Sequence, residues 1–285
     1  MAIKNIICAV NKTSSLSPTI DEASELAKIF DAKVHPIHII GPLKKSKFSQ
    51  DELREQLQDQ LDHIFLEDQD HIENAKVFKG RFPNELKKIT QPLQSPLILI
   101  GRQKNGWFKH FTKSRAERLV KKPLCPIWIH PHKSPVLLPK SIICAIDFTD
   151  LRAASMAVSI AKNCNTQIHF VHIIPEEANF SDFYISMQDS KVNVDKETHS
   201  QTIKNYFIEA LAQLDIDEIP YQIHIKFGET SDQISQLYQE LNADLLIVGN
   251  SSHSKIQHLL MGSTLKYILK ENKGDILVVP EISTY

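Results

Sequence analysis

Several features that would place the chain in a membrane, outside the cell or on nucleic acid are missing from its sequence. No apolar run approaches the roughly 20 residues of a transmembrane helix. The N-terminal segment MAIKNIICAVN enters a strand pattern at once and lacks a signal-peptide pattern. The formal net charge of −1 argues against a nucleic-acid-binding surface, which needs a strong basic bias. We therefore expect a globular protein that binds neither membrane nor nucleic acid.

Cysteine is scarce, and its four positions do not form the pattern of a metal or redox centre. Cys8, Cys125, Cys144 and Cys164 include no C-x-x-C pair, which favours reduced thiols in a cytoplasmic protein. Cys8 and Cys144 alternate with apolar neighbours and are predicted to be buried, whereas Cys125 is predicted to be more exposed. The sequence also shows no nucleophile–base pair at diagnostic spacing and no metal signature. We therefore expect no enzymatic activity and no required metal.

What the chain does contain is an internal repeat, in which five strand-like segments recur in the same order. The segment NIICAVNKT, from Asn5, returns as SIICAIDFT, from Ser141, a shift of 136 residues. The other pairs begin at Val34 and Ile168, Val77 and Ile225, Leu97 and Leu245, and Cys125 and Gly274. A proline-rich linker, 131–139, separates the two copies. The repeat predicts two domains, residues 1–132 and 139–285.

Helical patterns alternate with these strands. We expect helices over 21–30, 49–67, 83–90 and 113–122, and in the second copy over 152–163, 202–214, 232–241 and 263–270. This alternation predicts an α/β fold, in which each domain is an open, five-stranded parallel sheet with helices on both faces. The second copy also carries an insertion around 175–200, which we interpret as a mobile loop or a covering arm.

The segment Asp244–Pro280 has the composition of a phosphate-binding loop. A buried strand, Leu245–Val248, leads directly into Gly249, which allows backbone N–H groups to approach an anion. A second small-residue step at Gly262 precedes a helix whose N-terminus, led by Ser263, adds unpaired donors. The segment is neither a Walker A loop nor a G-x-G-x-x-G loop.

The spacing Gly249-x2-Ser252-x9-Gly262-Ser263 resembles the G-x2-G-x9-G-[ST] motif of ATP-binding universal stress proteins. Ser252 departs from that motif, because glycine adopts backbone conformations there that serine reaches only at a cost. With the repeat, the resemblance extends over nearly the whole chain and is to the tandem, E-type members. It implies the adenine-nucleotide alpha-hydrolase-like fold.

The resemblance also implies a site for ATP or another adenine nucleotide in the second copy. The acid Asp147 and the backbone near Ile173 would hold the adenosine part. The phosphates would be held by Gly249, Ser252, Gly262, Ser263 and Thr264. A carboxylate accepts hydrogen bonds from ribose hydroxyls or an exocyclic amine; the alternative is that Asp147 only caps or turns the chain after its strand.

The first copy lacks these residues and is expected to be a structural partner. Asn11 replaces the acid, and Lys104 and Ser114 occupy the two later glycine positions. In the family, single domains pair through their last strands. The resemblance therefore implies an intramolecular pseudo-dimer in which Ile127–Ile129 pairs with Ile276–Val279, with a further homodimer left open.

The repeated histidines, His35 and His38 and then His169 and His172, are three residues apart on strands and therefore point to opposite faces. This spacing favours packing over metal binding. His253, in the candidate loop, is interpreted as exposed or as a phosphate contact.

Our main hypothesis is a cytoplasmic, non-catalytic stress-response regulator that binds an adenine nucleotide in its second domain. The alternative is a nucleotide-free stress protein that acts only through protein contacts. A third hypothesis, an ATP-using enzyme of the wider fold group, requires catalytic residues that the sequence does not reveal.

Overall fold

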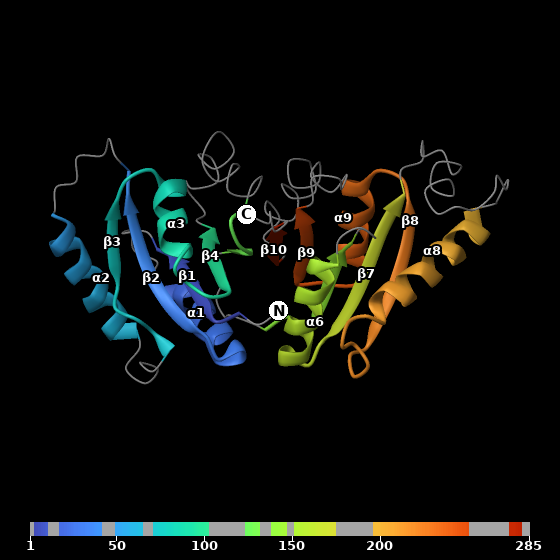
Figure 1. Cartoon of the computed structure of the whole chain (residues 1–285), viewed down its shortest axis with the longest axis horizontal. Helices are drawn as coiled ribbons and strands as arrows, with labels where there is room; N and C mark the ends of the chain where they lie inside the picture. Colours follow the sequence, from blue (N-terminus) through green and yellow to red (C-terminus); the bar gives the residue numbers. More distant parts are fainter. Residues whose placement is uncertain are drawn as a thin grey trace.

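The computed structural model describes residues 3–10, 17–41, 49–64, 71–102, 123–131, 138–146, 151–174, 196–250 and 274–280. Their strands form one continuous ten-stranded sheet in the order β3-β2-β1-β4-β5-β10-β9-β6-β7-β8. The two halves of the chain lie side by side and meet at β5 and β10 (Figure 1). No helix in the described part of the chain is both long and apolar enough to cross a bilayer.

The first half alternates strands and helices as its sequence predicts. Its elements are β1 (Asn5–Ala9), α1 (Ser17–Phe30), β2 (Lys33–Ile40), α2 (Gln50–Ile64), β3 (Lys76–Lys79), α3 (Phe82–Thr90), β4 (Pro96–Arg102) and β5 (Ile127–Pro131). The second half repeats this order with β6 (Ser141–Ala145), α6 (Arg152–Cys164), β7 (Gln167–Ile174), α8 (Lys196–Leu211), β8 (Tyr221–Phe227), α9 (Thr230–Glu240), β9 (Leu245–Asn250) and β10 (Asp275–Pro280). The helices expected over 113–122 and 263–270 lie outside the described residues.

Within each half all strand pairs are parallel, and only the central pair is antiparallel. In that pair, Ile276 lies opposite Ile129, Leu277 opposite Trp128 and Val278 opposite Ile127. The predicted pairing of the two last strands within one chain is therefore confirmed. Each last strand gains a hydrogen-bonding partner, which protects an apolar edge that would otherwise be exposed.

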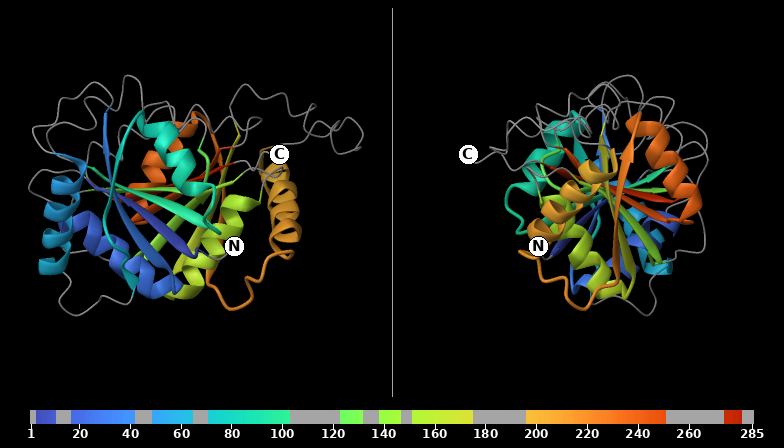
Figure 2. Two further views of the ribbon diagram at one scale, coloured as in Figure 1. Left: turned by 60° about the vertical axis from the view of Figure 1, so that its left-hand side comes forward. Right: turned by 90° about the vertical axis from the view of Figure 1, so that its right-hand side faces the viewer.

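Helices cover both faces of the sheet, as the α/β pattern predicts (Figure 2). One face packs against α1, α2, α6 and α8 through an apolar layer that includes Leu26, Met156 and Phe207. The other packs against α3 and α9 through residues such as Leu86 and Tyr238. Strands enclosed in this way carry apolar side chains in near-continuous runs, which is why the sequence shows runs rather than alternation.

The ends of the helices follow from local side-chain chemistry. At the start of α2 the Ser49 hydroxyl accepts from the Glu52 N–H at 3.2 Å, and the Glu52 carboxylate accepts from the Ser49 N–H at 2.6 Å. This reciprocal capping box sets the helix start close to the predicted one. The start of α8 differs from the prediction, since the helix begins at Lys196 rather than residue 202. Its first turns are polar, so apolar periodicity does not reveal them.

The prediction for Cys125 is wrong. This side chain is only 5% exposed and packs in the apolar layer under α3 and α9. The register of β4 against β5 explains the burial. Ile98 pairs with Ile127, and the N–H of Ile98 donates to the carbonyl oxygen of Pro126. The residues just before β5 are thereby drawn into the sheet.

Candidate functional site

Two residues of the predicted nucleotide site lie at one edge of the sheet in the second half. Ile173 is near the carboxyl end of β7, and Gly249 is near the carboxyl end of β9. Strand β6 lies between them and is parallel to both, so the residue that follows β6 emerges at the same edge. Open parallel sheets bind ligands at this edge. The other five predicted residues lie outside the described residues: Asp147, Ser252, Gly262, Ser263 and Thr264.

A repeated histidine fixes the backbone just before Asp147. The Nδ1 atom of His172 lies 3.2 Å from the carbonyl oxygen of Ile146, and Ile146 N–H donates to the carbonyl of Val171 at 3.0 Å. In the first half, Nδ1 of His38 lies 2.9 Å from the carbonyl oxygen of Val10. A carbonyl only accepts hydrogen bonds, so Nδ1 carries the proton in both cases. The histidines thus have a strand-end structural role, as the sequence indicated.

The two halves differ at the helix position that, in the first half, packs against the glycine near the end of the fourth strand. In the first half, a Cβ atom on Gly101 would overlap the hydroxyl group of Thr19, which α1 places against β4. Helix α1 aligns with α6 when 134 is added to its residue numbers. At this shift Asp31 corresponds to Asn165, and each residue follows its helix with a φ of 49°. Thr19 therefore corresponds to Ala153, which has neither a hydroxyl nor a methyl on its Cβ. The side chain at this helix position is therefore smaller in the second half than in the first.

The cysteines in the described residues do not offer a nucleophile. Burial raises the pKa of the Cys125 thiol to about 12. Burial, followed by the charges of Glu22 and Asp244, raises the pKa of the Cys164 thiol to about 11. Because the thiolate is the reactive form, these side chains are inert near neutral pH.

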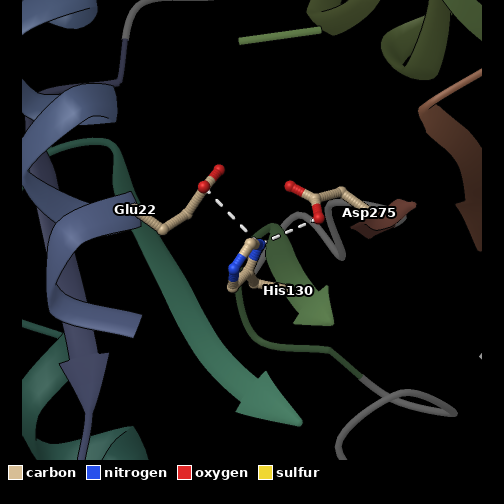
Figure 3. Close-up of side chains that lie close together, drawn as sticks. All are labelled: Glu22, His130 and Asp275. Carbon is tan, nitrogen blue, oxygen red and sulfur yellow. Dashed lines mark hydrogen bonds and ion pairs between the residues drawn. The ribbon is translucent and has the colours of Figure 1, made fainter. Parts of the chain in front are cut away.

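The structure also brings together three polar residues that the sequence did not single out: Glu22 of α1, His130 of β5 and Asp275 of β10 (Figure 3). The Nδ1 atom of His130 lies 3.0 Å from Oδ1 of Asp275 and 3.5 Å from Oε2 of Glu22. Glu22 is only 2% exposed and His130 only 4%. Burial, followed by the charge of Asp275, raises the pKa of the Glu22 carboxyl. These residues are far apart in the sequence, so no local motif could have revealed them.

A pair of histidines, one buried and one partly buried, predicts a pH-dependent stability. Nδ1 of His169 lies 3.1 Å from Nε2 of His224, and burial lowers the pKa of both rings. An unfolded histidine titrates near about 6.5. Below that pH the unfolded chain binds more protons than the folded chain. The contribution of this pair to the free energy of unfolding is therefore fully present above about pH 6.5 and is lost as the pH falls toward the lowered pKa values of the folded state.

Denaturant midpoints measured across this pH range would check the prediction. We expect a His224→Gln variant to lose less stability on acidification than the wild type. His71→Gln, at a histidine outside the pair, is the matched control and should keep the wild-type slope. Equal slopes for all three proteins would contradict the assignment.

Comparisons with known proteins agree with this architecture. A model of the universal stress protein family matches residues 2–131 and 139–280. Universal stress protein G of Salmonella typhimurium (strain LT2) is 26% identical over 147 residues, which are 49% of this chain and 98% of that protein. The crystal structure of a universal stress protein from Archaeoglobus fulgidus DSM 4304 covers 99% of this chain and 97% of its own, with 18% identity and a TM-score of 0.66.

A universal stress protein crystallised in complex with cAMP covers 50% of this chain and 98% of its own, with 22% identity and a TM-score of 0.36. The cAMP complex is a property of that protein. The family model, in contrast, matches each half of this chain separately and together covers most of its length. The chain therefore belongs to the universal stress protein family, as a tandem member with two such domains.

Proposed function

We propose that this protein is a non-catalytic stress-response regulator whose second half binds ATP or another adenine nucleotide. The observation that carries the proposal is the difference between the halves at equivalent sheet edges. Beside Gly101 the space is filled by Thr19, whereas the residue of α6 that corresponds to Thr19 is Ala153. The same edge of the second half has Asp147 where the first half has Asn11.

In the proposed complex, residues that follow different strands contact different parts of the nucleotide. Asp147, after β6, accepts hydrogen bonds from the ribose or the adenine amine. The side chain of Ile173 is partly buried, and its backbone borders the adenosine part of the nucleotide. The phosphates take N–H and hydroxyl donors from Gly249, Ser252, Gly262, Ser263 and Thr264.

Binding without turnover is part of this proposal. The thiols of Cys125 and Cys164 have raised pKa values and are not nucleophiles. Nucleotide occupancy would then act as a signal that partner proteins read, and any hydrolysis would be incidental. All four cysteines are free, which suits a protein that works in the reducing cytoplasm.

Replacing Asp147 with alanine is expected to weaken adenine-nucleotide binding by about tenfold or more, since hydrogen bonds to a charged group contribute about 1.5–3 kcal/mol. Titration calorimetry with ATP on the full chain would measure the change. Asn11→Ala, at the equivalent position of the first half, is the matched control and should bind like the wild type. If Asp147→Ala also binds like the wild type, the acid does not contact the nucleotide.

Position 252 separates nucleotide binding from the nucleotide-free alternative. If serine strains the loop, Ser252→Gly should raise ATP affinity, because glycine adopts the required backbone more readily. Small molecules released from the denatured native protein, identified by mass spectrometry, provide an independent check. Released adenine nucleotide supports the proposal. No released nucleotide, with no ATP affinity in either wild type or Ser252→Gly, would favour a protein that acts only through protein contacts.

A further inference from the structure

We propose that Glu22, His130 and Asp275 form a binding site for a divalent transition-metal ion such as Zn²⁺, held between the two halves of the chain. One imidazole nitrogen and two carboxylate oxygens are ligands that this class of ion accepts. Asp275 is the first residue of β10, whereas Gly249 pairs with Val279 further along that strand. The site is therefore separate from the proposed nucleotide site and does not depend on it.

The distances between the candidate ligand atoms suit a single ion. The Nδ1 atom of His130 lies 3.0 Å from one carboxylate oxygen and 3.5 Å from the other, and one ligand atom from each residue lies within 4.8 Å of the rest. Ligands about 2.0–2.2 Å from a tetrahedral zinc ion are about 3.3–3.6 Å apart. Coordination through Nδ1 would leave the ring proton on Nε2.

Secondary structure holds two of the ligands in place. The antiparallel register, in which Ile276 lies opposite Ile129, puts Asp275 directly opposite His130 on the same face of the sheet. The indole N–H of Trp128, two residues before His130, donates to Oδ2 of Asp275 at 2.6 Å. A donor to the second carboxylate oxygen orients the first toward an ion, as partners behind metal ligands do.

The buried carboxyl groups of this cluster favour the binding of a cation. Glu22 Oε2 is a buried atom without a hydrogen-bond partner, and Figure 3 shows the Glu22 carboxylate directed at the imidazole and Asp275. A carboxylate taken out of water without compensation is costly. Binding of a divalent ion would favour the ionised form of both carboxylates and neutralise their charge.

The equivalent position of the other half shows that the fold does not need this cluster. With the helix shift of 134 residues, Glu22 corresponds to Met156. With the shift of 149 residues between β5 and β10, His130 corresponds to Val279, and Asp275 corresponds to Pro126. All three counterparts are buried and apolar. The polar set is therefore specific to one side of the pseudo-dimer, where it joins α1 and β5 of the first half to β10 of the second.

Metal content and calorimetry on the full chain would test the site. After removal of bound metal with a chelator, wild-type protein is expected to take up one equivalent of Zn²⁺ and to melt at a higher temperature with the ion present, because a ligand that binds only the folded state stabilises it. Glu22→Gln and Asp275→Asn keep the side-chain shapes but remove a charge, and each should lose at least tenfold in Zn²⁺ affinity. Glu25→Gln, on the exposed side of the same helix, should bind like the wild type.

A further variant keeps the test decisive if the amide substitutions impair folding. Glu22→Met introduces the residue found at the equivalent position, and we expect it to fold, to melt without metal at or above the wild-type temperature, and to show no zinc-induced shift. Wild-type protein that takes up no Zn²⁺ would overturn the proposal. So would Glu22→Met protein that still binds one equivalent with wild-type affinity, since the ion would then lie elsewhere.

Discussion

Replacing Trp128 with alanine is expected to lower the free energy of unfolding by about 3–5 kcal/mol, the range for large buried aromatic side chains. Trp128 is fully buried at the antiparallel seam and packs in the layer that also contains Leu277 and Val279. Its removal also leaves the Oδ2 atom of Asp275 without the indole donor. Both losses fall where the two halves of the chain meet, so the effect on the whole molecule should be large.

Urea unfolding followed by far-ultraviolet circular dichroism would measure this change. Trp128→Phe separates the two contributions, because phenylalanine keeps most of the apolar volume but has no N–H group. We expect it to cost about 1–3 kcal/mol, the penalty for a buried acceptor that loses its donor. If Trp128→Ala unfolded at the wild-type urea concentration, Trp128 would not support the seam.

Replacing Gly274 with alanine is the second change for which we expect a large loss of stability. A Cβ at this position would overlap the hydroxyl of Tyr238 and the backbone carbonyl of Asp244. The backbone has little freedom to move away, because the N–H of Asp275 donates to that carbonyl at 2.7 Å. Overpacking of this kind costs about 1–3 kcal/mol, and a fixed backbone neighbour places the expected effect at the upper end.

Gly80→Ala is the matched control for this prediction. The three atoms nearest to its added Cβ all belong to the flexible side chain of Glu85, which can move aside more easily than backbone. The expected change is about 0–1 kcal/mol in either direction. Thermal unfolding of both variants beside the wild type would distinguish them. Equal melting temperatures for Gly274→Ala and Gly80→Ala would show that the close approach at Gly274 is not required.

The seam has consequences for both proposed sites. Pairing of β5 with β10 places His130 opposite Asp275, which creates the candidate metal site. The same pairing makes the chain a pseudo-dimer whose halves have diverged: Thr19 lies beside Gly101 in the first half, and its counterpart in the second half is Ala153. Duplication thus allows the two halves to differ at equivalent positions, as the proposed nucleotide site in the second half requires.

The architecture was predictable because the repeated segments are recognisable from the pattern of apolar and polar residues within each segment. Apolar runs at Leu97 and Leu245, each followed by glycine, identify equivalent buried strands. Polar, capped segments such as the one at Ser49 identify helix starts. Where the local signal is weak, prediction was less accurate, since α8 begins before its apolar stripe does.

The sequence by itself determined the order of strands and helices, the duplication and the resemblance that implies a nucleotide site, because each depends on residues near one another in the chain. Only the tertiary structure decided that Cys125 is buried and that Glu22, His130 and Asp275 converge. These three residues come from one helix and two strands, and their contact depends on helix packing and strand register. Neither quantity is encoded in a local pattern, since both arise only when distant segments bury apolar surface together.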